Sequence, residues 1–204
     1  TQPYYVHSKG WICMRPKSVT VANAIAEAMM QACKNNNIGY CQGHRTTVIE
    51  QLRKRGSLAK ISAKTEADCS SLVRACCIQA GFDPSNFNTS SEVSALKASK
   101  QFMEPITVTS GTKLYNGDIL VTKTKGHTVV VASGNPRQAV SYYPKYKGAS
   151  GSIVTALAAV GEKDTSKNHR AKIAAANGIK NYAYTAAQNL EMVNLLKKGK
   201  LIKA

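Results

Sequence analysis

The sequence predicts an α+β fold, in which helices come first, an antiparallel sheet follows, and a small all-α module ends the chain. Three observations predict it. Residues 18–98 have apolar side chains at the i, i+3, i+4 spacing of amphipathic helices, β-branched runs occupy residues 106–131, and helical spacing returns after residue 152. Helices followed by strands along the chain are typical of α+β domains with an antiparallel sheet.

Four helical patterns make up the first part of the chain. They cover residues 18–33, 48–56, 69–81 and 89–98. Ser18 or Thr20 can cap the first, and Gly81 stops the third. The fourth begins with Thr89-x-x-Glu92, a spacing that predicts a capping box, in which the two side chains satisfy backbone N–H groups reciprocally.

Three β-branched runs separated by glycine-containing turns predict the strands of the sheet, at residues 106–109, 118–122 and 128–131. Beyond them, residues 144–151 contain Pro, Gly and Ser without either period, which indicates a linker. Residues 153–160, 167–177 and 185–198 then give three helical patterns. The sequence therefore predicts a domain over residues 1–143, a linker over 144–151 and a helical module over 152–204.

The net charge of +17 predicts a polyanionic partner, such as nucleic acid or an anionic cell wall. The charge is spread along the chain, with +11 on residues 1–150 and +6 on residues 151–204. No basic helix or arm concentrates it, so general attraction to an anionic matrix is favoured over base-specific DNA binding.

The apolar runs are too short for a membrane protein, since a spanning helix needs about 18–20 apolar residues. Residues 1–16 lack the basic and apolar regions of a signal peptide, and whether residues precede Thr1 stays open. Export through a signal peptide is therefore not expected, and neither is a membrane partner.

The six cysteines favour a reduced protein without disulfides. Cys33, Cys76 and Cys77 fall on apolar faces of predicted helices, where free thiols are commonly buried. No C-x-x-C pair or Cys/His grouping with zinc-like spacing is recognised, so neither a metal site nor a cofactor is expected.

Cys69 is the candidate nucleophile. It stands at the first turn of an apolar helix, where unpaired N–H groups and the helix dipole favour the thiolate. His127 is the candidate base, because it opens a buried strand, whereas His7, His44 and His169 lie in polar or loop-like contexts. The alternative is that Cys69 is a packed thiol without a catalytic role.

Two motifs in this order resemble the NlpC/P60 cysteine peptidases. The first is Asp68-Cys69-Ser70 at the start of a helix, and the second, some fifty residues later, is Gly117-Asp118 followed by Gly126-His127 before an apolar strand. The resemblance is closest to catalytic modules of phage and prophage endolysins of Gram-positive bacteria. It implies a papain-like core, in which the helix that carries Cys69 packs on an antiparallel sheet.

The resemblance also implies the roles of several residues. Cys69 would attack an amide carbonyl and form a thioester, with His127 as its base, while Asp68 and Ser70 complete the helix start near the oxyanion site. Tyr40, in Ile-Gly-Tyr, resembles a family tyrosine whose hydroxyl reaches the active site, although it could equally be a core tyrosine.

The third catalytic position departs from the family pattern, which usually has a polar residue on the strand after the histidine. Gln138 is favoured as the group that orients His127, because its amide oxygen can reach an adjacent strand. Asn135 and Ser141 remain alternatives.

The favoured function is a peptidoglycan endopeptidase acting on Gram-positive cell walls, present in the host bacterial cytoplasm until lysis and then at the wall. An N-acetylmuramoyl-L-alanine amidase with the same Cys-His core is the nearest alternative. A basic nucleic-acid-binding protein is a more distant one, and nucleic acid is not the expected partner. Residues 152–204, faintly similar to LysM modules, would bind the wall, stabilise the chain or form a homo-oligomer.

Overall fold

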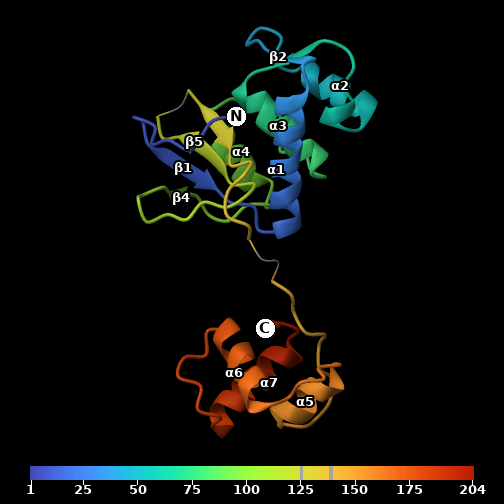
Figure 1. Cartoon of the computed structure of the whole chain (residues 1–204), viewed down its shortest axis with the longest axis vertical. Helices are drawn as coiled ribbons and strands as arrows, with labels where there is room; N and C mark the ends of the chain where they lie inside the picture. Colours follow the sequence, from blue (N-terminus) through green and yellow to red (C-terminus); the bar gives the residue numbers. More distant parts are fainter. Residues whose placement is uncertain (125, 138–139) are drawn as a thin grey trace. The chain divides into compact units, whose positions relative to one another are not determined.

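The computed structural model describes residues 1–124, 126–137 and 140–204, and the chain divides into two compact units, residues 1–139 and 140–204 (Figure 1). The described residues form seven α-helices, one short 3-10 helix and six strands. This mixed architecture with an antiparallel sheet confirms the predicted α+β class.

The sheet of the first unit contains β1 (Trp11–Met14), β4 (Ile106–Thr107), β5 (Ile119–Thr122) and β6 (Thr128–Val130). They pair in the order β4-β1-β5-β6, and every pair is antiparallel. The strands predicted at 118–122 and 128–131 are confirmed to within one residue, whereas the run at 106–109 forms a strand only over its first two residues. β1 was not predicted, because its side chains are buried on both faces of the sheet and show no alternation between apolar and polar residues.

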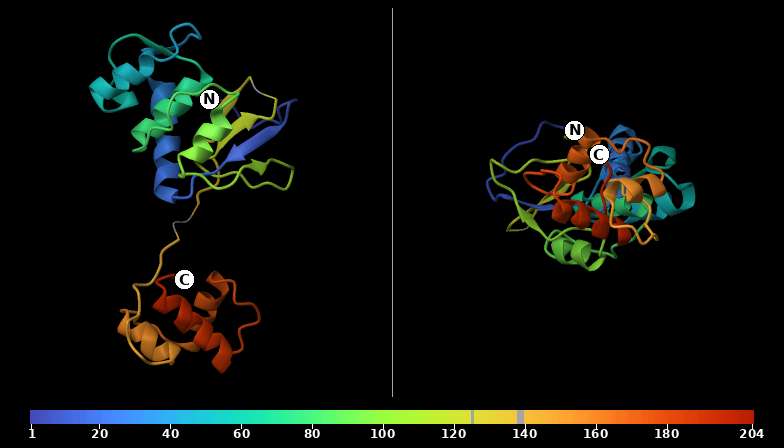
Figure 2. Two further views of the ribbon diagram at one scale, coloured as in Figure 1. Left: turned by 180° about the vertical axis from the view of Figure 1, so that it is seen from behind. Right: turned by 90° about the horizontal axis from the view of Figure 1, so that it is seen from below.

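The helices of the first unit are α1 (Val19–Lys34), α2 (Thr47–Arg55), α3 (Cys69–Gln79) and α4 (Glu92–Ala98), with a 3-10 helix at Leu58–Lys60. Figures 1 and 2 show α1, α2 and α3 on one side of the sheet. The main core lies there, between Met14 and Val121 of the sheet and residues such as Ile25 and Val73 of the helices. A smaller cluster around Trp11 covers the opposite face.

Two short parallel strands, β2 (Ile38–Tyr40) and β3 (Thr65–Ala67), form a second sheet that the sequence did not predict. At three residues each they are too short to show a period. The Thr47 hydroxyl holds them to the start of α2, since it accepts a hydrogen bond from the Glu66 N–H and donates one to the Glu66 carbonyl. β3 leads directly into Asp68 and α3.

The predicted capping box at Thr89 and Glu92 is wrong. The N-cap of α4 is Ser91, and it makes no side-chain capping bond. Thr89 instead accepts a hydrogen bond from the N–H of Gly126, and Glu92 turns into the core to accept one from Thr128. Tertiary contacts with the β5–β6 hairpin therefore take both side chains away from the helix end.

All six cysteines are free thiols. Cys76 and Cys77 are buried as predicted, but Cys33 is exposed. The buried face of α1 contains Ala28, Met29 and Ala32, and Cys33, the residue after Ala32, projects to a different side of the helix.

The second unit packs α5 (Ile153–Ala159), α6 (Lys167–Ala176) and α7 (Ala186–Lys197) around their own core. Its start differs from the predicted boundary. Tyr143 was assigned to the first domain and Tyr146 to the linker, yet both are buried in the second core, with Tyr146 only 7% exposed. Large aromatic rings complete a core that three short helices leave unfilled.

Within the described ranges, every helix is too short or too polar to cross a lipid bilayer.

Candidate active site

Cys69 is the first residue of α3, and a capping box fixes this helix start. The Asp68 carboxylate accepts a hydrogen bond from the Ser71 N–H at 2.7 Å, and the Ser71 hydroxyl accepts one from the Asp68 N–H at 2.9 Å. Asp68 therefore caps the helix. Burial favours a raised pKa for Asp68, but hydrogen bonds from Arg45 and Ser71 outweigh it and lower the pKa.

A cavity of about 480 Å³ opens in front of Cys69, and we call it the Cys69 cavity. Asp68, Cys69 and Ser70 form its helix side. The remaining lining residues come from the loops around it: Lys9, Gln42, Asn88, Thr89, Ser90, Thr124 and Gly126. The candidate nucleophile therefore faces an open, largely polar space.

The surroundings of Cys69 raise the pKa of its thiol above the usual 9.0. Burial is the main cause, and the carboxyl groups of Asp68 and Glu92 act in the same direction. Hydrogen bonds from the backbone N–H groups of Thr128 and Ser70 oppose the rise. The sequence predicted that the helix start would favour the thiolate, but burial prevails, and the neutral thiol is the stable form of Cys69 at neutral pH.

His127 immediately precedes β6, and its backbone is fixed by Thr122. The His127 carbonyl accepts from the Thr122 N–H at 3.0 Å, and the His127 N–H donates to the Thr122 hydroxyl at 3.1 Å. Its ring packs beside Trp11 and His7, with centroids 6.3 and 6.4 Å away. Burial, helped by the charge of His7, lowers the pKa of His127 below 6.5, so the ring is neutral at pH 7.

The residues on both sides of His127 reach Cys69. Gly126 lines the Cys69 cavity, and the backbone of Thr128 lies near enough to the Cys69 sulfur to oppose the rise in the pKa of the thiol. The His127 imidazole itself makes no hydrogen bond to any residue within the described ranges. The residues on either side of His127 therefore lie close to Cys69, whereas the His127 ring packs beside Trp11.

A family model for an endolysin-like domain matches residues 1–138. The chain belongs to the endolysin-like domain family. No curated protein and no solved structure matches it. The family indicates a cell-wall lytic function, with peptidoglycan as the partner.

Of the three residues considered for orienting His127 in the endolysin-like domain, Gln138 lies outside the described residues. Asn135 donates its side-chain amide to the carbonyl of Leu114 at 3.0 Å. Ser141 belongs to the second unit, where its carbonyl accepts from the N–H of Lys203. Neither Asn135 nor Ser141 hydrogen-bonds His127.

Tyr40 ends β2 and is 66% exposed, so it is not a core tyrosine. Its hydroxyl accepts a long hydrogen bond, 3.4 Å, from the side chain of Gln42, which lines the Cys69 cavity. Tyr40 therefore lies near the cavity and contacts it through Gln42.

Arg45 is a site residue that the sequence analysis missed. Its guanidinium donates to the Asp68 carboxylate at 2.6 Å, to the Ser70 hydroxyl at 2.9 Å and to the Phe87 carbonyl at 2.6 Å. These bonds, which we call the Arg45 clamp, join the loop after β2 to both residues that flank Cys69. No sequence pattern marks Arg45, because 23 residues separate it from Asp68.

Glu92 is a second missed residue. Its carboxyl group is fully buried, with one oxygen accepting from the Thr128 hydroxyl at 2.7 Å and the other without a hydrogen-bond partner among the described residues. Burial raises the pKa of Glu92 to about 8, the nearby Asp68 adds to the rise, and the Thr128 bond opposes it. A largely protonated acid therefore lies behind Cys69 at neutral pH.

The Gly-Asp motif before His127 has a structural role here. Asp118 is buried and accepts two hydrogen bonds from Arg15, at 2.9 and 2.8 Å, and one from the Tyr115 N–H. Gly117 has a φ of +80°, and any β-carbon there would overlap the backbone of Ala22 in α1. This glycine lets β5 approach α1, and the aspartate ties β5 to Arg15 just after β1.

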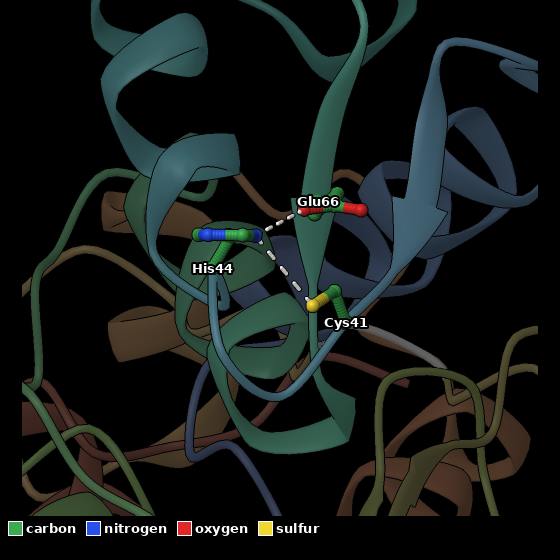
Figure 3. A group of neighbouring side chains, drawn as sticks. All are labelled: Cys41, His44 and Glu66. Carbon is green, nitrogen blue, oxygen red and sulfur yellow. Dashed lines mark hydrogen bonds and ion pairs between the residues drawn. The ribbon is translucent and has the colours of Figure 1, made fainter.

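Three potential metal ligands converge beside the Cys69 cavity, which contradicts the expectation that no such Cys/His grouping exists. They are Cys41, His44 and Glu66 (Figure 3). The His44 Nδ1 atom lies 3.7 Å from the Cys41 sulfur and 3.0 Å from a Glu66 carboxylate oxygen. The spacing Cys41-x-x-His44 was visible in the sequence, but Glu66 joins only because β3 pairs with β2.

Proposed function

We propose that this endolysin-like protein is a cysteine peptidase of the NlpC/P60 type, with a papain-like core, that hydrolyses amide bonds in the peptides of Gram-positive peptidoglycan. The observation that carries the proposal is the position of Cys69, which begins α3 at the wall of an open cavity that is also lined by Gly126, the residue before His127. Family membership supplies the cell-wall substrate.

The reaction proceeds through a thioester. His127 takes the proton of the Cys69 thiol as the sulfur attacks the amide carbonyl carbon, and the backbone N–H groups of Cys69 and Ser70 at the helix start stabilise the oxyanion. His127 then gives its proton to the leaving amine as the C–N bond breaks. Water, deprotonated by His127, hydrolyses the thioester and releases a carboxylate, and Cys69 regains its proton.

The pKa shifts of Cys69 and His127 support a mechanism in which His127 accepts the thiol proton during the reaction and not before it. Cys69 has a raised pKa and His127 a lowered one, so the pair rests as a neutral thiol and a neutral imidazole. We propose that the ring leaves Trp11 and turns toward Cys69 when substrate fills the cavity, since catalytic hydrogen bonds often tighten only in the substrate complex. Gln138 remains the proposed orienting group.

The second unit is proposed to bind the wall. Residues 151–204 carry 9 basic and 3 acidic residues, a charge suited to anionic wall polymers. Tyr184 is partly exposed and has the cationic groups of Lys167 and Arg170 near its ring, each 5.6 Å from its centroid. An aromatic ring with adjacent cations can pack on a sugar face and hold an anionic group at once.

The test is turbidity loss of purified Gram-positive walls, followed by mass analysis of the fragments. Cys69→Ala and Cys69→Ser should abolish lysis with folding intact, and thiol alkylation should inactivate the wild type. Cys33→Ser, which changes an exposed thiol on α1, is the matched control and should stay active. New amino groups within the stem or cross-link peptides mark an endopeptidase, whereas peptides freed from the sugar mark an amidase. Lysis by Cys69→Ala would overturn the mechanism.

A further inference from the structure

The cluster of Cys41, His44 and Glu66 lies outside the proposed catalytic machinery. Cys41 and His44 belong to the loop between β2 and α2, and Glu66 lies on β3. Figure 3 shows the three side chains directed toward one another. The ligand atoms of all three lie within 4.8 Å of one another.

One nitrogen, Nδ1 of His44, makes both short contacts of this cluster. With its proton, this nitrogen donates to the Glu66 carboxylate and lies beside the Cys41 sulfur. Without its proton, the same nitrogen presents a lone pair to the space between the two groups and is a metal ligand. Because both contacts involve this one nitrogen, the three residues do not form a Cys-His-acid relay, which uses the two different nitrogens of the ring.

The distances agree with a tetrahedral metal site. With Zn–S near 2.3 Å and Zn–N and Zn–O near 2.05 Å, a tetrahedron places sulfur and nitrogen about 3.5 Å apart and nitrogen and oxygen about 3.3 Å apart. The observed separations are 3.7 and 3.0 Å. A thiolate and a carboxylate would also balance the charge of a divalent cation, with a neutral histidine as the third ligand.

We propose that Cys41, His44 and Glu66 bind zinc, with a water as the fourth ligand. His44 is 72% exposed at its side chain, and a cavity of about 380 Å³ lined by His44 and Glu66 leaves room for that water. Three protein ligands and one open position are typical of accessible zinc sites, and a thiolate together with an imidazole selects zinc over magnesium or calcium.

The ion would join the loop 41–46 to β3. That loop also supplies Gln42 to the Cys69 cavity and carries the Arg45 clamp, while β3 runs directly into Asp68. The backbone of Glu66 is already fixed by Thr47. Zinc would therefore fix the loop 41–46, which lines the Cys69 cavity through Gln42, to β3, which is followed by Asp68 and Cys69.

Cobalt(II) titration of the full chain tests the site, because a thiolate bound to four-coordinate cobalt gives near-ultraviolet charge-transfer bands and strong visible bands. The Cys69→Ala variant is used so that the catalytic thiol cannot contribute. We expect these bands in Cys69→Ala, their displacement by zinc, and their loss on adding Cys41→Ser. His44→Ala and Glu66→Gln should weaken binding at least about tenfold, as losses of ligand-supporting groups already do.

Cys33→Ser, added to the same background, removes another exposed thiol and should leave the bands unchanged. Zinc should also slow hydrogen exchange of residues 41–46 in the wild type but not in Cys41→Ser. Bands that persist in Cys41→Ser, or that are absent from Cys69→Ala, would overturn the proposal. Because these readouts need no turnover, they distinguish failure of the zinc site from failure of the proposed peptidase activity.

Discussion

Burial shifts the pKa values of Cys69 and His127 in opposite directions. A low dielectric disfavours the charged form of each group, which is the thiolate for cysteine and the imidazolium for histidine. At neutral pH both groups are uncharged, so in the proposed mechanism the proton passes from Cys69 to His127 during the reaction. The rate of that reaction would depend on His127 being neutral beforehand.

The pH dependence of wall cleavage follows from this state. As pH rises, His127 loses its proton below 6.5, so kcat/KM should rise along a limb centred below that value. His7→Gln removes a neighbouring charge that lowers the pKa of His127, so the limb should move to higher pH. Initial rates on soluble muropeptides between pH 4 and 9 measure both, and a limb unmoved by His7→Gln would contradict the assignment.

Glu92 makes the stability of the first unit depend on pH. Its pKa of about 8 lies above the ordinary 4.5, so the folded protein holds a proton that the unfolded chain releases between these values. The contribution of Glu92 to the free energy of unfolding should therefore be greatest below about pH 4.5, and it should be lost as the pH rises through about 8. Fully buried carboxylates are costly unless they are paired.

Glu92→Gln should remove this dependence, because an amide keeps the hydrogen bond from Thr128 and carries no charge. Above pH 8 the variant should melt several degrees higher than the wild type, at roughly 2–4 °C per kcal/mol for a chain of this size. Glu50→Gln, at an exposed position, is the control and should leave the slope unchanged. Parallel pH profiles for Glu92→Gln and wild type would contradict the assigned ionisation.

At the scale of elements, the start of α3 is held from three directions. Asp68 caps the helix, the Arg45 clamp joins the cap to the loop after β2, and the backbone of Thr128 approaches from β6. Arg45 can make these contacts together because its planar guanidinium donates in several directions, which a lysine ammonium does not reproduce.

Arg45→Ala should cost about 2–3 kcal/mol in the free energy of unfolding, since it leaves Asp68 without its charged partner. Arg45→Lys should recover little of this. Arg53→Ala is the control, because Arg53 pairs with Asp83 on the surface and an exposed pair contributes only about 0–1 kcal/mol. Urea unfolding gives all three values. Equal losses for Arg45→Ala and Arg53→Ala would show that the Arg45 clamp stabilises the fold no more than a surface ion pair does.

The sequence predicted those elements whose side chains repeat over several turns or along a β-branched run, such as α1, α3, β5 and β6. It missed β1, β2 and β3, which have three or four residues each and are defined by their pairing partners. The helix start at Cys69 is local and was predictable. Arg45, Glu92 and Glu66 come to the site through contacts between distant segments, and no local pattern records such contacts.

At the scale of the whole molecule, the chain forms two units with separate apolar cores. The first unit contains the Cys69 cavity, and the core of the second is built by three helices and two buried tyrosines. Each unit has its own apolar cluster, so each is expected to fold by itself. The positive charge extends over both, and binding to an anionic wall should depend on salt throughout.

Residues 1–139 alone should hydrolyse soluble muropeptides at close to the full-length rate but sediment more weakly with intact walls. Residues 140–204 alone should bind walls, less well as the salt concentration rises and less well again in Tyr184→Ala. Co-sedimentation measures binding, and analytical ultracentrifugation of residues 140–204 tests for oligomers. If that unit fails to bind walls and instead self-associates, it is an oligomerisation device and the wall-binding proposal is lost.

The two ends of the second unit are paired with each other. The Lys203 N–H donates to the Ser141 carbonyl, and the Tyr143 N–H donates to the Leu201 carbonyl. The first and last residues of this unit therefore lie side by side. We therefore expect this unit to be transferable to another enzyme through its one end, and a protein fused after Ala204 would begin beside the point at which the unit is attached.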